Sequence, residues 1–511
     1  MPYFWVGKEN LHLEKLADIA RRGVELRLSG ESEKKMDATW KRIAQWLAEE
    51  RCIYGITTGF GALSDVSISS KDTIRLQKNL LMSHAAGVGN PLDEETVRAV
   101  MTLRIQDLAM GYSAIRKETV HFLIEMLNRG IVPLIPEKGS VGASGDLCPL
   151  AHLSLVMIGM GEAYYKGQRM PGSQALKKCG MQPRELRSGE GLSLINGTQV
   201  MTAIGALTAY DALHLCRLTD IAAAMSLEVL MGSRTEFDPR IHQIRPHKGQ
   251  KNSADNMLRI TKNSEIVSSH KDCCRVQDAY TLRCSPQVHG ASHDAVHYAS
   301  AVLETEMNSC TNNPLIFSES GEFLSGGNFH GQPVALALDF MAMALAELAN
   351  ISERRIERLV NPKLSGLPAF LVEDGGLNSG FMIAQYTAAS LVSENKILSH
   401  PACVDSIPTS ANKEDHVSMG TIAARKCREI LRNTAHVIGI EFLCAAQALD
   451  LFTNMKPGQG TRAAYEVIRE TIPHLEKDRV LSADIESIIR LMHSGKILGA
   501  VEKKVGKLTV C

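Results

Sequence analysis

Apolar side chains recur at three- and four-residue spacing along one long stretch of the chain, and two other stretches have other features of long helices. Within residues 334–360 this spacing places one apolar seam on a helix, formed by Leu338, Met341, Leu345 and Leu348. Residues 196–231 contain no proline, and Gly232 follows them at a position typical of a helix end. Residues 416–451 also lack proline and carry bulky apolar side chains on several sides. The pattern therefore predicts three long helices, one over each stretch.

Strand-like alternation is rare in the rest of the chain, and no chain of strand–helix–strand units indicates a parallel sheet. We therefore expect a mainly α fold, a long-helix bundle with a smaller N-terminal domain that carries the active-site loops. The predicted domains are residues 1–195, with the loops, and residues 196–511, with the bundle and the C-terminal helices packed as one unit. Helices that are apolar on several sides need many neighbours, so we expect a homo-oligomer. The number of chains, which we expect to be four as a homotetramer, does not follow from this pattern.

The composition excludes several classes of partner. Lys and Arg total 56 against 56 Asp and Glu, so no net charge draws the chain to nucleic acid or to an anionic membrane. Hydrophobic residues make up 44% and charged residues 22%, as in a globular protein with a large core. The most apolar stretch, residues 334–349, is interrupted by Asp339 and Glu347 and falls short of a membrane span. Residues 1–23 lack the pattern of a secretory signal, so we expect a soluble, cytoplasmic protein.

Three histidines lie four residues apart, at His289, His293 and His297. This spacing places their rings on one face of a helix, where two of them could bind a metal. No carboxylate signature accompanies them, and a polar stripe on a packed helix explains them as well. The twelve cysteines include no C-x-x-C pair. We therefore predict no metal site and leave the role of the three histidines open.

Glycine- and proline-rich loops interrupt the helical segments, and loops are where a functional site is expected. The four most distinctive loops span residues 54–61, 133–149, 271–287 and 326–333. The second loop contains GSVGASGD over residues 139–146, in which glycines at three-residue spacing bracket a serine. This motif is the strongest chemical signal in the chain.

Two familiar functions of a glycine loop do not fit this motif. A phosphate-binding loop would carry lysine after its last glycine, where Asp146 stands and would repel phosphate. A hydrolase nucleophile elbow needs one residue between the serine and the next glycine, but Gly145 follows Ser144 directly.

The Ala143-Ser144-Gly145 triplet within GSVGASGDLCPLAH resembles the site of the methylidene-imidazolone enzymes, the family of aromatic amino acid ammonia-lyases and aminomutases. The resemblance covers almost the whole chain, through YGITTGFG, NLLMSHAAGVG, GLSLINGTQ, VQDAYTLRCSPQVHG, SGGNFHGQP, GLNSGFMIAQ and TSANKEDHVSMG. Within the family, the chain is most similar to the members that act on histidine. The resemblance therefore implies elimination of ammonia from L-histidine to give trans-urocanate.

The resemblance also implies that Ala143, Ser144 and Gly145 cyclise autocatalytically to 4-methylidene-imidazol-5-one and that no external cofactor is needed. The small side chains leave room for the tight bend in which the Gly145 nitrogen meets the Ala143 carbonyl carbon. The resulting electrophile would capture the substrate amine. For the base that removes the β-proton, the family offers Tyr54 and Tyr280, and the sequence does not decide between them.

Further site residues follow from the same resemblance. Arg283 is expected to clamp the substrate carboxylate, because a guanidinium group matches a carboxylate with two parallel hydrogen bonds. The amides of Asn196 and Gln277 are expected near the electrophile and the substrate, and Phe329 is expected to line the pocket. Asn196 also stands where the N-cap of the helix over residues 196–231 would lie.

Substrate choice is expected to depend on His84 and Glu414. The Glu414 carboxylate can bind the substrate imidazole, and a pocket with buried polar groups rejects an apolar ring. An aromatic amino acid ammonia-lyase or aminomutase of the same family is the alternative, and an aminomutase would return the ammonia to the β-carbon. A helical scaffold without activity is a further alternative, which predicts neither a cyclised triplet nor turnover.

Overall fold

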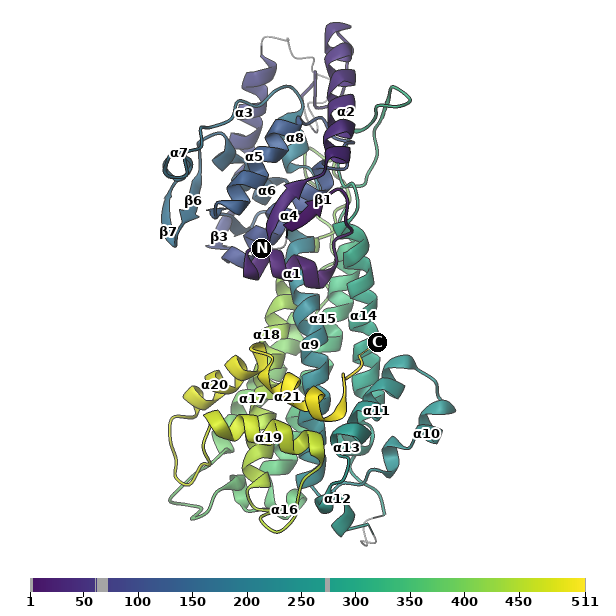
Figure 1. Cartoon of the computed structure of the whole chain (residues 1–511), viewed down its shortest axis with the longest axis vertical. Helices are drawn as coiled ribbons and strands as arrows, with labels where there is room; N and C mark the ends of the chain where they lie inside the picture. The colour runs from purple at the N-terminus through teal and green to yellow at the C-terminus, as the bar shows by residue number, and fades with distance from the viewer. Residues whose placement is uncertain (1–2, 60, 62–71, 272–275, 511) are drawn as a thin grey trace. The chain divides into compact units, whose positions relative to one another are not determined.

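The structure, a computed structural model, describes residues 3–59, 61, 72–271 and 276–510 (Figure 1). Helices make up most of it and its strands are short, so the expected mainly α fold is confirmed. Phe60 of the first distinctive loop and residues 272–275 of the third lie outside the described residues.

The chain divides into two compact units, each assembled from three separate stretches. Unit 1 comprises Met1–Tyr210, Ser300–Asp339 and Pro401–Arg425, and unit 2 comprises Asp211–Ala299, Phe340–His400 and Lys426–Cys511. The breaks after residues 210, 299, 339 and 425 fall inside α9 (Gln199–Val229), α14 (Ser285–Met307), α15 (Gln332–Val360) and α18 (Gly420–Leu449). The division predicted between residues 195 and 196 stays a prediction.

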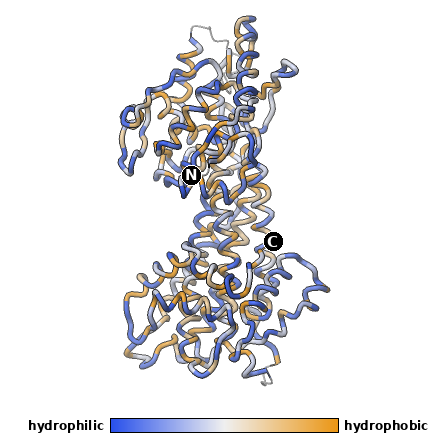
Figure 2. Tube along the Cα trace, viewed as in Figure 1, coloured by the Kyte–Doolittle hydropathy of each residue, from blue (hydrophilic) through white to orange (hydrophobic). Residues whose placement is uncertain are grey.

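The three predicted long helices are confirmed as α9, α15 and α18, with ends that differ by a few residues from those expected. Apolar positions recur along them, interspersed with polar ones (Figure 2). Most side chains of α9 are buried, as expected for a helix that is apolar on several sides. Its length and composition would allow α15 to cross a membrane, but 67% of its most apolar 18-residue window is buried within the protein, as in a core helix.

Unit 1 holds the elements that come before α9 and one later strand pair. They are β1 (Tyr3–Val6), α1 (Leu13–Arg22), β2 (Glu25–Leu28), α2 (Gly30–Ala48), α3 (Thr73–His84), β3 (Val88–Pro91), α4 (Glu94–Leu108), α5 (Lys117–Asn128), β4 (Ile131–Pro133), β5 (Pro136–Lys138), α6 (Leu147–Met157), β6 (Glu162–Tyr165), β7 (Gln168–Pro171), α7 (Gly172–Lys178), α8 (Glu190–Ile195), β8 (Leu315–Phe317) and β9 (Glu322–Leu324). Helices α3, α6 and α8 pack against one another, and the ends of these three helices carry residues of the candidate site.

The described strands form small sheets of two or three strands. The pairs β3–β5, β4–β6, β6–β7 and β8–β9 are antiparallel. The β1 and β2 strands pair in parallel around α1, with Tyr3 opposite Glu25. This single pair is not the chain of strand–helix–strand units that a parallel α/β sheet needs, and strands of four residues are too short to give a periodic signal in the sequence.

Unit 2 combines parts of the long helices with shorter ones. They are η2 (Thr235–Phe237), α10 (Pro239–Gln243), α11 (Lys248–Ile260), α12 (Glu265–Ser269), α13 (Tyr280–Arg283), α16 (Pro362–Ser365), η3 (Ala369–Leu371), α17 (Met382–Leu398), α19 (Gln459–Thr471), α20 (Leu481–His493) and α21 (Lys496–Val505). Here α19 packs against α21, α20 and α11.

Candidate active site

The loop that carries the triplet lies in unit 1, just before α6, and has an unusual backbone. Ser144 adopts a left-handed conformation with φ +50°, and Gly145 follows with φ +66°. A left-handed conformation costs a residue with a side chain about 1 kcal/mol or more, so surrounding contacts must hold Ser144 in place. A Cβ atom on Gly145 would lie 2.0 Å from the Gly197 carbonyl oxygen. Only glycine fits there, and the triplet is pressed against the chain that leads into α9.

Asp146 anchors this loop through hydrogen bonds. The sequence did not predict this role. Its carboxylate is fully buried and accepts hydrogen bonds from the Ser140 hydroxyl at 2.8 Å and the Thr421 hydroxyl at 2.5 Å. It also accepts the backbone N–H groups of Val200 and Met201, both at 2.9 Å. Burial raises the pKa of Asp146, and these hydrogen bonds oppose the rise. The aspartate therefore fastens the triplet to the first turns of α9 and α18.

Two further segments lie beside the loop. The Met419 N–H donates to the Val141 carbonyl at 2.9 Å, and the Gly331 N–H donates to the Gly142 carbonyl at 3.3 Å. The Ala143 side chain is buried against Val417 and Met419. The loops that precede α6, α9, α15 and α18 are thus joined within unit 1, and each of these helices begins directly after its loop. Helix N-termini carry partial positive charge, which favours an anionic group beside them.

Glu414 contacts the triplet directly. The Ser144 hydroxyl donates to Glu414 Oε1 at 3.2 Å, and the Thr409 hydroxyl donates to Glu414 Oε2 at 2.9 Å. No ion pair to Glu414 is found within the described part of the chain. The sequence predicted Glu414 as a site residue and missed Thr409, whose only signal was its place in the same segment.

His84 ends α3 on the same unit. Its Nδ1 atom lies 2.9 Å from the Leu80 carbonyl oxygen and 3.0 Å from the Ser83 hydroxyl. Burial lowers the pKa of His84, while the Leu80 carbonyl and the charge of Glu414 act in the opposite direction. The two residues predicted to choose the substrate are therefore coupled electrostatically.

Tyr54 and Asn196 are also placed in unit 1. The half-buried Tyr54 accepts a hydrogen bond on its hydroxyl from the Gly61 N–H at 3.3 Å. A Cβ atom on Gly61 would lie 2.6 Å from Ser410 Oγ, so this loop abuts the segment that carries Glu414. Asn196 donates its amide to the Asn313 carbonyl at 3.2 Å, while its Oδ1 atom is buried and has no donor in the described structure. Such an unpaired acceptor indicates a missing partner.

Asn196 differs from the expectation in one respect. It is the C-cap residue of α8, and α9 begins only at Gln199, so the predicted N-cap role is wrong. The cause is the tight chain at Gly197, which pairs with Gly145 in a β-bridge and delays the helix.

Phe329 is half-buried in the loop before α15, and its role in lining the pocket stays a prediction.

Three predicted site residues lie in unit 2, Tyr280 and Arg283 at the two ends of α13 and Gln277 just before it. Gln277 is exposed, and Tyr280 is 70% exposed. The Arg283 guanidinium lies over the Tyr280 ring, 4.6 Å from its centre, and the buried Arg283 Nε has no hydrogen-bond partner in the described structure. An exposed tyrosine stacked on an arginine with an unpaired donor has the chemistry to bind a carboxylate. Their roles toward the triplet stay predictions.

The histidine row on α14 is part of a buried polar network in unit 2. His289 Nδ1 lies 2.8 Å from Asp220 Oδ1, and Arg355 Nη1 lies 3.3 Å from His289 Nε2. His293 is also buried, while His297 is exposed. Burial lowers the pKa of both His289 and His293. The described residues contain no group of three or more potential ligands that could hold a metal.

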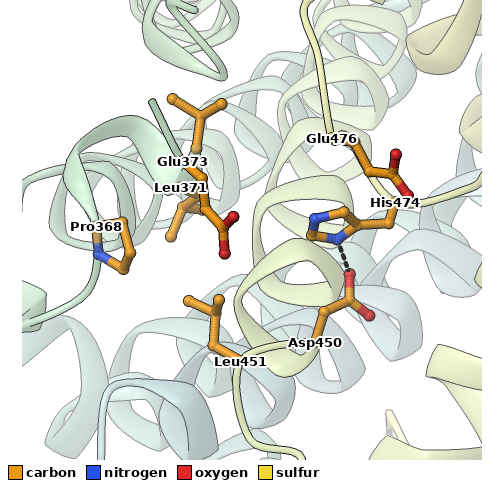
Figure 3. A pocket seen from close by; sticks show the side chains of 8 residues that line it. Pro368, Leu371, Glu373, Asp450, Leu451, His474 and Glu476 are labelled. Carbon is orange, nitrogen blue, oxygen red and sulfur yellow. Dashed lines mark hydrogen bonds and ion pairs between the residues drawn. The ribbon is translucent and has the colours of Figure 1, made fainter. Parts of the chain in front are cut away.

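Unit 2 also contains a cavity of about 370 Å³ between α18 and the segments that follow α15 and α19 (Figure 3). Its wall includes Asp450, which accepts hydrogen bonds from Tyr465 at 2.6 Å and Arg469 at 2.7 Å and lies 2.5 Å from His474 Nδ1. None of the predicted site residues lines this cavity.

The fold and the loop together define a mainly helical protein that carries an Ala-Ser-Gly triplet beside a carboxylate. Residues 11–470 match the aromatic amino acid lyase family, and the chain belongs to that family. It is similar to the histidine ammonia-lyase of Alkaliphilus oremlandii, with 55% identity over 505 residues that cover 99% of each chain.

Solved structures agree with this assignment. The histidine ammonia-lyase of Trypanosoma cruzi has a TM-score of 0.91 and 41% identity, covering 98% of this chain and 95% of its own. The tyrosine aminomutase of Streptomyces globisporus has a TM-score of 0.94 and 37% identity, covering 99% of this chain and all of its own.

Proposed function

We propose that this protein eliminates ammonia from L-histidine to give trans-urocanate. The observation that carries the proposal is the place of the Glu414 carboxylate, which accepts a hydrogen bond from the hydroxyl of the uncyclised Ser144 and has no cationic partner in the described structure. A carboxylate beside the reactive triplet can accept an N–H from an imidazole ring but gains nothing from a phenyl ring. The 55% identity with a histidine ammonia-lyase over nearly the full length supports the same substrate.

The residues of the triplet fit the methylidene-imidazolone group that the family implies. Ser144 and Gly145 already have the left-handed backbone of a tight bend, and Ala143 is buried among apolar side chains. The buried Oδ1 atom of Asn196 is an acceptor without a donor. Asn196 directly precedes Gly197, the residue whose backbone lies against Gly145. When formed, the group supplies an electrophilic carbon for the substrate amine, and no external cofactor is needed.

The other residues bind and orient the substrate in this proposal. Arg283 holds the substrate carboxylate with its guanidinium group, and the Gln277 amide forms hydrogen bonds near the electrophile and the substrate. Phe329 lines the pocket, and His84 and Glu414 receive the imidazole ring. The deprotonated hydroxyl of Tyr54 or of Tyr280 accepts the β-proton and becomes a phenol. Both tyrosines remain candidates, because Tyr54 lies in unit 1 with the triplet and Tyr280 carries the stacked arginine.

We also propose that the protein is a cytoplasmic homotetramer. Large apolar side chains are exposed on α17, including Ile383, Tyr386 and Ile397, at 55%, 61% and 73% of their surface. An exposed apolar row on one helix is typical of a surface that another chain covers. Light scattering coupled to size-exclusion chromatography would give the mass of four chains, and a stable monomer would contradict the assembly.

The test of the activity is an incubation of purified protein with L-histidine, L-tyrosine and L-phenylalanine in parallel. We expect the absorbance of urocanate to grow with matching ammonia for histidine only. Turnover of tyrosine or phenylalanine instead of histidine would contradict the proposed substrate. No turnover of any of the three amino acids would favour the alternative of a helical scaffold without activity.

An aminomutase activity is the second candidate. The tyrosine aminomutase structure is as similar in fold as the histidine lyase structure, so the fold alone does not separate the two outcomes. Chromatography of the products would separate them, because an aminomutase yields a β-amino acid and a lyase yields urocanate and free ammonia.

A further inference from the structure

The two oxygens of the Glu414 carboxylate have different partners. Oε1 accepts from Ser144, and Oε2 accepts from the Thr409 hydroxyl at 2.9 Å. A glutamate side chain has several rotatable bonds, and holding a carboxylate in one orientation therefore takes a second contact. Thr409 supplies that contact, because its hydroxyl fixes which oxygen faces the triplet.

The backbone reinforces this pairing. Thr409 and Glu414 form an antiparallel β-bridge, in which the Thr409 N–H donates to the Glu414 carbonyl at 2.9 Å and the Glu414 N–H donates back at 3.3 Å. Directly opposed residues of an antiparallel pair direct their side chains to the same face. The bridge therefore aims the Thr409 hydroxyl at the Glu414 carboxylate.

The turn that closes the bridge is strained. Ser410, Ala411 and Asn412 all have left-handed backbones, with φ of +51°, +51° and +67°. Each such residue with a side chain costs on the order of 1 kcal/mol, and strain of this kind persists where surrounding contacts fix it. Here the two bridge hydrogen bonds and the side-chain bond enclose all three residues.

The chemistry of the donor also matters. Thr409 is neutral, so its hydrogen bond orients the carboxylate without neutralising the charge. A lysine or arginine in its place would form an ion pair with Glu414 and compete with the imidazole ring for the carboxylate. A hydroxyl partner is therefore suited to a carboxylate that must be fixed in direction and still be free to bind a polar ring.

We propose that Thr409 is a positioning residue, whose hydroxyl sets the orientation of the Glu414 carboxylate and thereby its ability to bind the imidazole ring of the substrate. This inference rests on the proposed function, since it assigns a partner to the residue that selects histidine in that proposal.

The test compares Thr409→Val and Thr409→Ser by steady-state kinetics with L-histidine. Valine keeps the shape and removes the hydroxyl, and we expect a loss in kcat/KM of about 10- to 100-fold. Serine keeps the hydroxyl, so it should retain activity within about threefold of the parent. Thr102→Val is the matched control, because Thr102 is buried in the same unit and donates only to the Arg98 carbonyl within α4.

Coupling to Glu414 separates positioning from folding. In a Glu414→Ala background, adding Thr409→Val should change the residual rate by less than twofold, because the oriented group is already absent. Equal losses in both backgrounds, or a valine variant as active as the parent, would overturn the inference, as would a serine variant as impaired as the valine variant. A parent protein that does not convert histidine would instead overturn the proposed function.

Discussion

The Ser144 hydroxyl donates a hydrogen bond to Glu414 Oε1 over 3.2 Å, although the two residues are 270 positions apart in the chain. The contact joins the loop before α6 to the segment before α18, and both lie in unit 1. The residue that the whole family is expected to convert and the residue that we assign to the imidazole ring are thus direct neighbours. One residue pair links the shared chemistry with the choice of substrate.

Replacing Ser144 with alanine should abolish turnover and spare the fold. Without the hydroxyl, the triplet cannot lose the water that creates the electrophile, so we expect the rate with histidine to fall by roughly 10³-fold or more. The backbone strain at this position is already present with serine, so the melting temperature should move by only a few degrees. Ammonia release and thermal unfolding followed by circular dichroism measure the two effects. Near-normal activity would contradict the assignment of the electrophile.

Gly145→Ala should be far more damaging than the same change at another left-handed glycine. Both Gly145 and Gly167 have positive φ, at +66° and +75°. A Cβ atom on Gly145 would meet the Gly197 carbonyl at 2.0 Å, whereas one on Gly167 meets nothing within 4 Å. We expect about 1–2 kcal/mol of loss from φ in both variants and an additional 1–3 kcal/mol or so from the clash at Gly145 alone. Equal losses in urea unfolding would show that the close approach is unimportant.

The long helices could be predicted from the sequence because their signal is local. The proline-free run of residues 196–231 and the apolar seam of residues 334–360 correspond to α9 and α15 within a few residues. The contacts that build the site are not local, and no periodicity encodes them. Asp146 illustrates this point, since it precedes α6 but caps α9, whose Val200 and Met201 N–H groups it accepts. The sequence shows the charge of Asp146 but not the N–H groups that bind it.

Contacts between residues far apart in the chain were predicted only where the family resemblance indicated them. Glu414 and His84 became candidates only through their motifs, because neither the spacing nor the composition relates residue 84 to residue 414. The sequence did not predict Thr409 as a site residue, because its role depends on the β-bridge to Glu414. That bridge is closed by Ser410, Ala411 and Asn412 in left-handed conformations, which their residue types do not predict.

Glu228 should make stability decrease as the pH rises. This carboxyl group lies at the end of α9 in unit 2 and receives the Gly458 N–H at 2.9 Å, and burial raises its pKa from 4.5 to about 8. Between pH 4.5 and about 8 the folded state keeps this proton and the unfolded state has lost it. Its contribution to stability is therefore complete below pH 4.5 and disappears as the pH approaches 8.

Glu228→Gln removes this titration, so the stability of the variant relative to the parent should increase with pH. The limit for one proton is about 1.4 kcal/mol per pH unit. Urea unfolding at several pH values between 5.5 and 8 measures the difference. Glu470→Gln, at an exposed position on α19, is the matched control and should give a difference that does not change with pH. A pH-independent difference for the Glu228 variant as well would mean that this carboxyl group is ionised in the folded state.

Arg355 and Glu441 form a fully buried ion pair in unit 2, and breaking it from one side should be costly. Arg355 Nε and Nη2 donate to the two Glu441 oxygens at 2.6 and 3.0 Å, and the hydroxyls of Ser226 and Ser352 donate to the same carboxylate at 2.7 and 2.6 Å. Arg355→Met leaves the buried carboxylate without its counter-charge, so we expect a loss of about 3–5 kcal/mol in the free energy of unfolding.

The double variant Arg355→Met with Glu441→Met tests why the single change is costly. Removing both charges eliminates the uncompensated carboxylate, so the double variant should be more stable than the single one. Arg462→Met provides the control, because Arg462 and Glu466 form an ion pair in which both side chains are more than half exposed, and its loss should cost at most about 0.5 kcal/mol. Urea unfolding of all three variants measures these differences. If Arg355→Met cost no more than Arg462→Met, the buried network around His289 would not contribute to stability in the way its geometry indicates.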